Sequence, residues 1–489
     1  MKLTLCSLLL ALSAAFAPAQ TATPPNAFKH IVIIFQENRT PDSLFYNLCT
    51  PPYGTAASCS ATPGKGQYDI QTTNWADKTN LPGKVIQPLP VPLANTYDLS
   101  HAHSAFVAMC DFSKTDVCQM DGASGIPCDA GKGDKCPTQP QFRYVDNSTG
   151  QINPYLDLAT QYGWANYMFQ TNQGPSFPAH QFIFGGTSAP SAADDAIGTF
   201  ASENMEKSGI AGTAKTAGCI APLGTQVQLI DSGGVEAKGN AIYPCFEHKT
   251  LADILPAGIT WRYYAPSAGS IWTAPDAISH ICESSGYGGE CLGQQWKNNV
   301  DLNPPDVFHD ISSCSLRSVN WVIPKGQYSD HAKGNLGEGP SWVGDIVDAI
   351  GDNPKCANGE SYWQDTAILI TWDDWGGWYD HEPPAILPFP QGGYQLGFRV
   401  PLIAVSAYTP SGYINNVPHD FGDILRFIEK NFRLTPGALN FADNRGPKND
   451  LTLFFDFSLA PRTFKTIKTA LPASYFINDT RPADDPDDQ

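Results

Sequence analysis

Two apolar segments, over 300 residues apart, have the composition of strands that are buried on both faces. Residues 28–35 contain the run Ile-Val-Ile-Ile-Phe, and residues 366–372 read Thr-Ala-Ile-Leu-Ile-Thr-Trp. Neither run alternates apolar and polar side chains as a half-exposed strand does. Continuous apolar strands are typical of parallel sheets that helices cover on both sides. The two segments therefore predict an α/β fold built on a mainly parallel sheet.

Other segments supply further elements for such a fold. Apolar residues recur at helical spacing in residues 153–162, in residues 342–350 and in the segment from Asp420 to Phe432. A proline before the second of these segments and a glycine just after it are typical helix boundaries. Four more runs are predicted to be strands: residues 164–169, 259–264, 318–323 and 400–407.

The composition favours a globular chain with a loop-rich surface. Of the 489 residues, 42% are hydrophobic and 16% are charged, and Gly 43 and Pro 41 are both high. We expect one main domain over residues 26–470, with irregular insertions at about 49–150 and 190–330. Residues 471–489 are expected to be an acidic tail. No internal repeat is visible.

The first 19 residues resemble a secretory signal peptide. Lys2 precedes an apolar stretch over residues 3–16, and Ala17-Pro18-Ala19 has the small-x-small pattern of a cleavage site. The stretch is shorter than the ~20 residues needed to span a bilayer. No twin-arginine pair precedes it. The pattern predicts Sec-type export and a secreted or periplasmic protein.

The cysteines agree with an oxidising compartment. Thirteen cysteines less Cys6 leave twelve, an even number suited to disulfides. A zinc cluster is the alternative interpretation, but CxxC spacing is absent. Disulfides are therefore expected, although the sequence does not specify their pairing.

The net charge of −18 argues against nucleic acid as a partner, because phosphate backbones need basic surfaces. It does not argue against a phosphate ester, since a single metal ion can meet that charge locally. Membrane contact is expected only if the substrate is a lipid.

Acidic and amide side chains follow both apolar strands. Glu37 and Asn38 end the first strand, and Asp373 and Asp374 end the second. Open α/β sheets bind ligands at the carboxyl ends of their strands, so we expect the four side chains to form an all-oxygen metal site. As alternatives, the aspartates could be ordinary turn residues, and Glu37-Asn38 could simply begin a helix. Indoles around the aspartates, which would exclude water, favour the metal site.

A serine and several histidines are candidates for the chemistry. Ser176 lies between Pro175 and Pro178, in a stiff turn that could fix its hydroxyl, although Gly-Pro-Ser turns are also common. His101 and His103 are two residues apart, and His331 and His381 each follow an aspartate that could orient the ring or keep it protonated. Any single histidine is more often structural; several together could supply a general acid.

The motifs together resemble the phosphoesterase family of bacterial phospholipases C and related acid phosphatases. They lie in order between about residue 28 and residue 435, and the Asp-Asp-Trp-Gly-Gly-Trp-Tyr-Asp-His stretch is the most specific. The segments are Gln36-Glu37-Asn38-Arg39-Thr40, Gly174-Pro175-Ser176-Phe177-Pro178, Ser329-Asp330-His331, Thr371 to Pro384 and Gly397-Phe398-Arg399-Val400-Pro401.

This resemblance implies an alkaline-phosphatase-like core and specific residue roles. Glu37, Asn38, Asp373, Asp374 and Ser176 would hold one divalent metal, and Ser176 would be the nucleophile. The oxygen ligands suit Ca²⁺, Mg²⁺ or Mn²⁺, with Zn²⁺ and Fe as further options.

The resemblance also implies catalytic histidines. His103 and His331 would contact phosphoryl oxygens or protonate the leaving group, and His280 is a further candidate for this role. His101 could replace His103, because the sequence cannot separate two histidines that are so close.

Departures from the family pattern bear on the substrate. Thr40-Pro41-Asp42-Ser43 follows Arg39, where the family commonly has Ser-Phe-Asp-His, and the chain ends soon after the last predicted helix. We therefore expect a single-domain, phosphatase-like or broad phosphoesterase, with phospholipase C activity as the other option. The alternatives are a sulfatase or phosphomutase relative and a secreted binding protein without catalysis. A sulfatase would need Arg where His180 stands.

Five aromatic residues allow two interpretations. They could line a choline- or lipid-binding mouth, or they could belong to the core. They are Trp261, Tyr263, Tyr264, Trp272 and Tyr287.

Overall fold

A computed structural model describes residues 24, 26–79, 83, 85–131, 133–206, 217–353, 356–385 and 396–483. The expected signal peptide, Cys6 and the last six residues of the expected tail lie outside these ranges. Every helix within them is too short or too polar to cross a bilayer.

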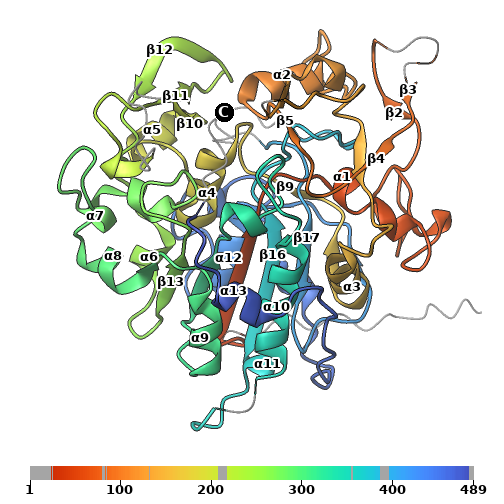
Figure 1. Cartoon of the computed structure of the whole chain (residues 1–489). Coiled ribbons are helices and arrows are strands. Elements are labelled where there is room, and N and C mark those ends of the chain that lie inside the picture. Colours follow the sequence, from red (N-terminus) through yellow and green to blue (C-terminus); the bar gives the residue numbers. More distant parts are fainter. Residues whose placement is uncertain are drawn as a thin grey trace, which may run out of the picture.

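The core of the molecule is an eight-stranded sheet in which β1 and β16 lie side by side at the centre (Figure 1). All neighbouring pairs are parallel except those of β17, which is antiparallel to both of its neighbours. The predicted mainly parallel sheet is confirmed. In spatial order the strands are β14 (Val300–Asp301), β13 (Trp261–Tyr264), β15 (Val319–Val322), β1 (His30–Gln36), β16 (Thr366–Trp372), β17 (Leu402–Val405), β8 (Gly163–Ala165) and β18 (Tyr413–Asn415).

Helices cover both faces of this sheet. Phe35 of β1 packs its ring against Phe421 of α12 (Phe421–Asn431) and against His180 of α4 (Ser176–Gly185). Gln36, the next residue of β1, points to the opposite face from Phe35, and Trp372 is its partner on β16. Trp372 therefore lies on that opposite face, where its ring contacts Tyr155 of α3 (Asn153–Gln161). The long helix α10 (Gly339–Gly351) packs beside α3 on that side. The three helices predicted from periodicity are α3, α10 and α12.

The other helices are short and connect the larger elements. They are α1 (Pro41–Leu44), α2 (His103–Cys110), α5 (Ala192–Ile197), α6 (Leu251–Ile254), α7 (Ser279–Cys282), α8 (Gln294–Asn299), α9 (Asp306–Ser312), α11 (Tyr362–Asp365) and α13 (Ala473–Ile477).

The two insertions contain small sheets that the sequence did not reveal. The second insertion holds a three-stranded antiparallel sheet, β10 (Phe200–Glu206), β11 (Gln226–Ile230) and β12 (Glu236–Ile242). The first insertion forms β2 (Trp75–Ala76) with β3 (Val85–Ile86), β4 (Leu89–Val91) with β7 (Arg143–Val145), and β5 (Tyr97–Leu99) with β6 (Cys128–Ala130). The segment predicted as one strand over 164–169 splits into β8 and β9 (Met168–Phe169), and β9 pairs with β19 (His419–Asp420).

A second hydrophobic cluster joins the first insertion to the loop after β16. Trp375, Trp378 and Tyr379 of that loop pack with Phe106, Phe142 and other insertion residues, and Trp375 and Trp378 are at most 1% exposed. The indoles therefore exclude water from the loop, as the sequence suggested.

The twelve cysteines other than Cys6 form six disulfides within the described residues, which confirms the disulfide prediction. All six are local, closing segments of 8 to 42 residues. The pairs are Cys49–Cys59, Cys110–Cys118, Cys128–Cys136, Cys219–Cys245, Cys282–Cys291 and Cys314–Cys356.

Most of the five ambiguous aromatic residues belong to the core. Trp261, Tyr263, Tyr264 and Trp272 are at most 6% exposed, whereas Tyr287 is 61% exposed. These four side chains therefore do not form an open lipid-binding surface.

Candidate active site

The parallel pairing of β1 with β16 brings the two acidic segments together. Gln36 is in register with Trp372, so the next residues of both strands leave the sheet at the same edge. The amide of Asp373 donates to the carbonyl of Gln36 at 2.8 Å, and the amide of Asn38 donates to Asp373 Oδ1 at 2.9 Å. Glu37, Asn38, Asp373 and Asp374 are all fully buried. The structure thus joins the four residues that the sequence selected as metal ligands.

The backbone of both loops is unusual at this point. Asn38 has φ 57°, a left-handed conformation that is rare for residues other than glycine and frequent at functional sites. Gly376 and Gly377 also have positive φ, 62° and 73°. A Cβ on Gly376 would lie 2.6 Å from the carbonyl oxygen of Asn38, and one on Gly377 would lie 2.4 Å from Leu99 Cβ. Glycine is needed here because the loop passes so closely over its neighbours.

Ser176 faces the same cluster from α4. It is the first residue of that helix, after Pro175, and it is fully buried. Its hydroxyl lies 3.3 Å from Asp374 Oδ2 and 3.5 Å from Glu37 Oε2. The position at the helix N-terminus places the positive end of the helix dipole beside the hydroxyl, which favours a developing oxyanion.

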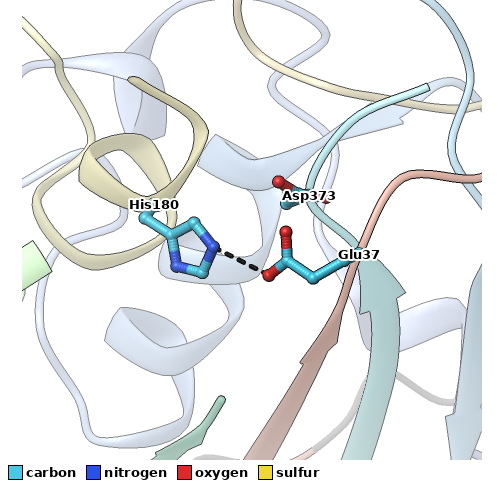
Figure 2. Close-up of side chains that lie close together, drawn as sticks. All are labelled: Glu37, His180 and Asp373. Carbon is cyan, nitrogen blue, oxygen red and sulfur yellow. Dashed lines mark hydrogen bonds and ion pairs between the residues drawn. The ribbon is translucent and has the colours of Figure 1, made fainter. Parts of the chain in front are cut away.

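His180 also belongs to the site, although we did not select it from the sequence. It follows Ser176 by four residues, so one helical turn places both on the same face of α4. Its Nε2 lies 3.1 Å from Glu37 Oε1, and Figure 2 shows the ring beside Glu37 and Asp373. The sequence predicted a stiff turn at Ser176, whereas the structure shows the helix α4, so the four-residue spacing of Ser176 and His180 becomes informative only once that helix is known.

The donor atoms of this cluster fit a divalent cation. Suitable ligand atoms of Glu37, His180 and Asp373 all lie within 4.8 Å of one another. Asp373 Oδ2 is buried with no hydrogen-bond partner among the described residues. A buried carboxylate oxygen without a donor is costly unless a cation or a proton reaches it.

The side-chain amide of Asn38 bears on the same question of whether a cation binds here. The amide atom that points at the carboxylates lies 3.2 Å from Asp373 Oδ1 and 3.1 Å from Glu37 Oε2. With oxygen in that position, three acceptors converge, and a cation or a proton is needed to offset their repulsion. With nitrogen there, the amide donates to both carboxylates and hydrogen bonds alone satisfy them. Cation binding and the amide orientation are therefore coupled.

His101, and not His103, contacts this cluster. His101 Nε2 lies 3.1 Å from the side-chain amide of Asn38 and 4.0 Å from Asp374 Oδ2. Its Nδ1 is 2.9 Å from the carbonyl of Leu99, so Nε2 is the atom directed at the cluster.

Between the two histidines that the sequence could not separate, the structure places His103 outside this cluster. His103 begins α2, its ring stacks on Phe106, and its Nε2 lies 3.3 Å from the carbonyl of Gly234. Because α2 begins at His103 whereas His101 precedes the helix, the two rings have different surroundings.

His331 lies beside His101, with ring centroids 5.9 Å apart. Its Nδ1 lies 2.7 Å from the carbonyl of Ala332. The preceding Asp330 does not orient the ring, because its Oδ2 accepts from the hydroxyl of Tyr155 and the indole of Trp372. Burial raises the pKa of Asp330 to about 6, against the opposing charge of Arg39. The acid beside His331 is thus a structural group.

His280 has other partners. It lies on α7, where its ring pairs with Glu247 at 2.8 Å and Asp253 at 3.0 Å. These contacts, with hydrogen bonding to Asp253 as the main cause, raise its pKa to about 9. The structure places it in a surface ion-pair group and not in the buried cluster.

The protein has an α/β fold with a buried acidic site at the carboxyl ends of its central strands. This is where proteins with open α/β sheets bind their ligands. The profile of the Phosphoesterase family matches residues 28–435. The chain therefore belongs to the Phosphoesterase family.

Relatives in this family include bacterial phospholipases C. The chain is 23% identical over 484 residues to the hemolytic phospholipase C of Pseudomonas aeruginosa, covering 89% of this chain and 57% of that protein. It is 29% identical over 248 residues to the non-hemolytic phospholipase C of Burkholderia pseudomallei, covering 41% and 35%. Thus the chain spans about half the length of the first relative and less of the second.

Among solved structures, the chain is similar to a protein of the alkaline phosphatase superfamily from Vibrio parahaemolyticus. The TM-score is 0.35 with 9% sequence identity, over 89% of this chain and 76% of that chain.

Proposed function

We propose that this protein is a secreted, metal-dependent phosphoesterase with Ser176 as its nucleophile. The observation that carries the proposal is the position of the Ser176 hydroxyl, which is buried within 3.5 Å of two carboxylates from different strand ends. Glu37, Asn38, Asp373, Asp374 and Ser176 would hold the cation. When bound, the cation would lower the pKa of the serine hydroxyl and offset charge on the phosphoryl oxygens.

The chain's own residues then account for the first step. The Ser176 hydroxyl has Asp374 Oδ2 and Glu37 Oε2 as proton acceptors. As its oxygen bonds to phosphorus, the ester bond on the opposite side breaks and the leaving oxygen needs a proton. For this step His331 acts as the imidazolium: its Nδ1–H donates to the Ala332 carbonyl, and its Nε2 proton passes to the leaving oxygen, which leaves the ring neutral.

In the second step, His331 accepts a proton from water, and the water oxygen bonds to phosphorus. The bond between phosphorus and the serine oxygen breaks, and the carboxylate that accepted the serine proton in the first step returns it, which restores the Ser176 hydroxyl. His101, whose ring lies beside that of His331, would stabilise the phosphoryl oxygens.

His180 bears on the identity of the metal. An all-oxygen set favours Ca²⁺, Mg²⁺ or Mn²⁺, whereas an imidazole nitrogen suits Mn²⁺, Zn²⁺ or Fe better than Ca²⁺. Because His180 Nε2 lies within 3.1 Å of Glu37, we propose Mn²⁺ as the first metal to test.

The proposed substrates are phosphate esters, either small monoesters or phospholipid head groups. The names of the relatives support the second class, and the buried, water-excluding loop after β16 suits either. Export is proposed from the first 19 residues and from the six disulfides. Mass spectrometry of the mature chain should find an N-terminus near Gln20.

The decisive experiment compares the wild type with Ser176→Ala on p-nitrophenyl phosphate, with and without a chelator. We expect the wild type to lose activity with chelator and regain it with Mn²⁺, and the variant to lose at least ~10³-fold in kcat. Ser188→Ala is the matched control, because Ser188 is equally buried but, among the described residues, its hydroxyl donates to the backbone carbonyl of Ala201 and not to a carboxylate.

Parallel assays test the rival functions. Turnover of p-nitrophenyl sulfate in place of phosphate would indicate a sulfatase, and turnover of neither would favour a binding protein. Hydrolysis of phosphatidylcholine, compared with the small monoester, assigns the substrate class. Full activity in Ser176→Ala would remove serine from the mechanism.

A further inference from the structure

A second buried group of charges lies beyond the candidate metal site. We call Asp42, Asp69, Asp380, His381 and Arg399 the Arg399 clasp. The four residues other than His381 are at most 1% exposed, and the His381 side chain is 8% exposed. Asp380, His381 and Arg399 belong to the sequence motifs described above. The proposed chemistry uses none of the five clasp residues.

Arg399 is the centre of this clasp. Its Nε and Nη2 bond the two oxygens of Asp380 at 2.8 and 3.0 Å, a bidentate fork. Its Nη1 bonds Asp69 Oδ2 at 3.0 Å and the carbonyl of Asn166 at 2.8 Å. Planar, bidentate pairs of this kind fix geometry as well as charge.

His381 closes the other side. Its Nδ1 lies 2.8 Å from Asp42 Oδ2, and its Nε2 lies 3.1 Å from Asp69 Oδ1. Burial alone would lower its pKa, but the charge of Asp42 and hydrogen bonds to both aspartates raise the pKa to about 10. Two cations therefore face three carboxylates.

The clasp is not itself a metal site. Asp42, Asp380 and His381 lie close enough together to suggest one. However, Arg399 already neutralises Asp380, and both ring nitrogens of His381 already face carboxylates. The positive charges of this group are those of Arg399 and His381 themselves.

The position of the clasp suggests its role. Asp42 follows Asn38 by four residues, and Asp380 follows Asp374 by six, so the clasp joins the two loops that carry the candidate ligands. The amide of His381 also donates to Asp42 Oδ2 at 3.0 Å, and the Thr40 hydroxyl donates to the carbonyl of Tyr379 at 2.8 Å. The same two loops are joined at the sheet edge by the Asn38 and Asp373 amides.

Buried ion pairs seldom add much net stability, because desolvation cancels most of their attraction. Their directional bonds can still fix one arrangement of two loops. We propose that the Arg399 clasp is a positioning device that holds Glu37 and Asn38 at binding distance from Asp373 and Asp374 before a cation arrives. This inference rests on the proposed metal-dependent function.

The test measures Mn²⁺ affinity of the full chain by calorimetry after removal of bound metal. Arg399→Lys keeps the charge but loses the fork, and we expect a 10–100-fold weaker Kd, as for other groups that orient metal ligands. We expect kcat to fall with little change in KM. Arg445→Lys is the matched control, because Arg445 pairs with the buried Asp195 in another part of the chain, and it should keep the wild-type Kd.

Asp42→Asn keeps the test decisive if Arg399→Lys does not fold. It preserves an oxygen acceptor but removes the charge beside His381, and the same weakening is expected. A folded variant of either kind with wild-type Mn²⁺ affinity would overturn the clasp proposal. A wild type that binds Mn²⁺ without hydrolysing any phosphate ester would overturn the proposed function alone, and one that binds no divalent cation would overturn both.

Discussion

At the scale of single residues, the main result is that several hydrogen-bond acceptors of the candidate metal site face one another. The side-chain amide of Asn38 contacts two carboxylates, and Asp373 Oδ2 has no donor among the described residues. His180 adds a nitrogen beside Glu37. The hydroxyl of Tyr263 donates to the carbonyl of Trp272, so its oxygen can accept from His180 Nδ1 at 3.3 Å. A neutral His180 would then present the lone pair of Nε2 to Glu37, an arrangement that suits a shared cation.

This contact leads to a prediction about metal preference. His180→Gln should weaken binding of Zn²⁺ and Mn²⁺ by about 10–100-fold and of Ca²⁺ by much less, because imidazole favours transition metals. Titration calorimetry with the three ions checks this. His248→Gln is the control, since His248 is also buried but lies next to Lys249 and Gly185. Unchanged Zn²⁺ and Mn²⁺ affinities would make His180 an ion-pair partner of Glu37 and not a ligand.

At the scale of elements, the loop after β16 combines three tasks. It carries Asp373 and Asp374 into the site, it places Trp375 and Trp378 in the second hydrophobic cluster, and it ends in the Arg399 clasp. Its turn is tight because Gly376 also donates its amide to Asp374 Oδ1 at 2.7 Å. A change in this turn should therefore affect the candidate metal site as well as stability.

Gly376→Ala tests this coupling against a control with the same backbone conformation. Gly376 and Gly412 both have φ 62°, but a Cβ on Gly412 would meet only Thr160 at 3.5 Å. Gly412→Ala should cost about 1–2 kcal/mol for the left-handed conformation alone. Gly376→Ala should cost clearly more, because its Cβ would collide with Asn38, and it should also weaken Mn²⁺ binding. Chemical denaturation and calorimetry provide the two measurements; equal losses in both variants would contradict the coupling.

At the scale of the whole molecule, the C-terminal segment is tied to the core of the fold. The sequence set residues 471–489 apart as an acidic tail, and residues 471–483 pack along the core. Phe476 of α13 is fully buried between Tyr328 and Trp342. Lys325 donates to the carbonyls of Asp479 and Arg481, and Arg481 pairs with Glu338 at 2.9 Å. These contacts hold the segment that leads to His331.

We expect Phe476→Ala to destabilise the protein by about 3–5 kcal/mol, the usual cost of removing a buried phenyl ring. Turnover should also fall, because Tyr328 lies three residues before His331. The neighbouring Ile477→Ala, at a side chain that is 53% exposed, should change stability by no more than about 0.5 kcal/mol. Thermal unfolding and p-nitrophenyl phosphate turnover measure both effects. A small loss in Phe476→Ala would show that α13 is dispensable.

Several elements could be predicted because their signals are local. The strand predicted over residues 367–372 differs from β16 by one residue at its start, and the amphipathic segment from Asp420 became α12. Strand endings rich in carboxylates pointed to the site because parallel strands share one carboxyl edge. The strands of β10 to β12 were missed because their pattern is irregular, with shifts in register along the pairs.

The amino-acid sequence alone determined the fold class, the disulfide chemistry and the residue types at the strand ends, since each depends on local composition or spacing. Only the tertiary structure decided that His101 and not His103 meets Asn38, that His180 joins Glu37, and that Arg399 joins Asp380 to Asp69. These choices depend on contacts between segments that are far apart in the chain. Hydrophobic patterns specify which surfaces are buried, but they do not specify which polar groups meet inside.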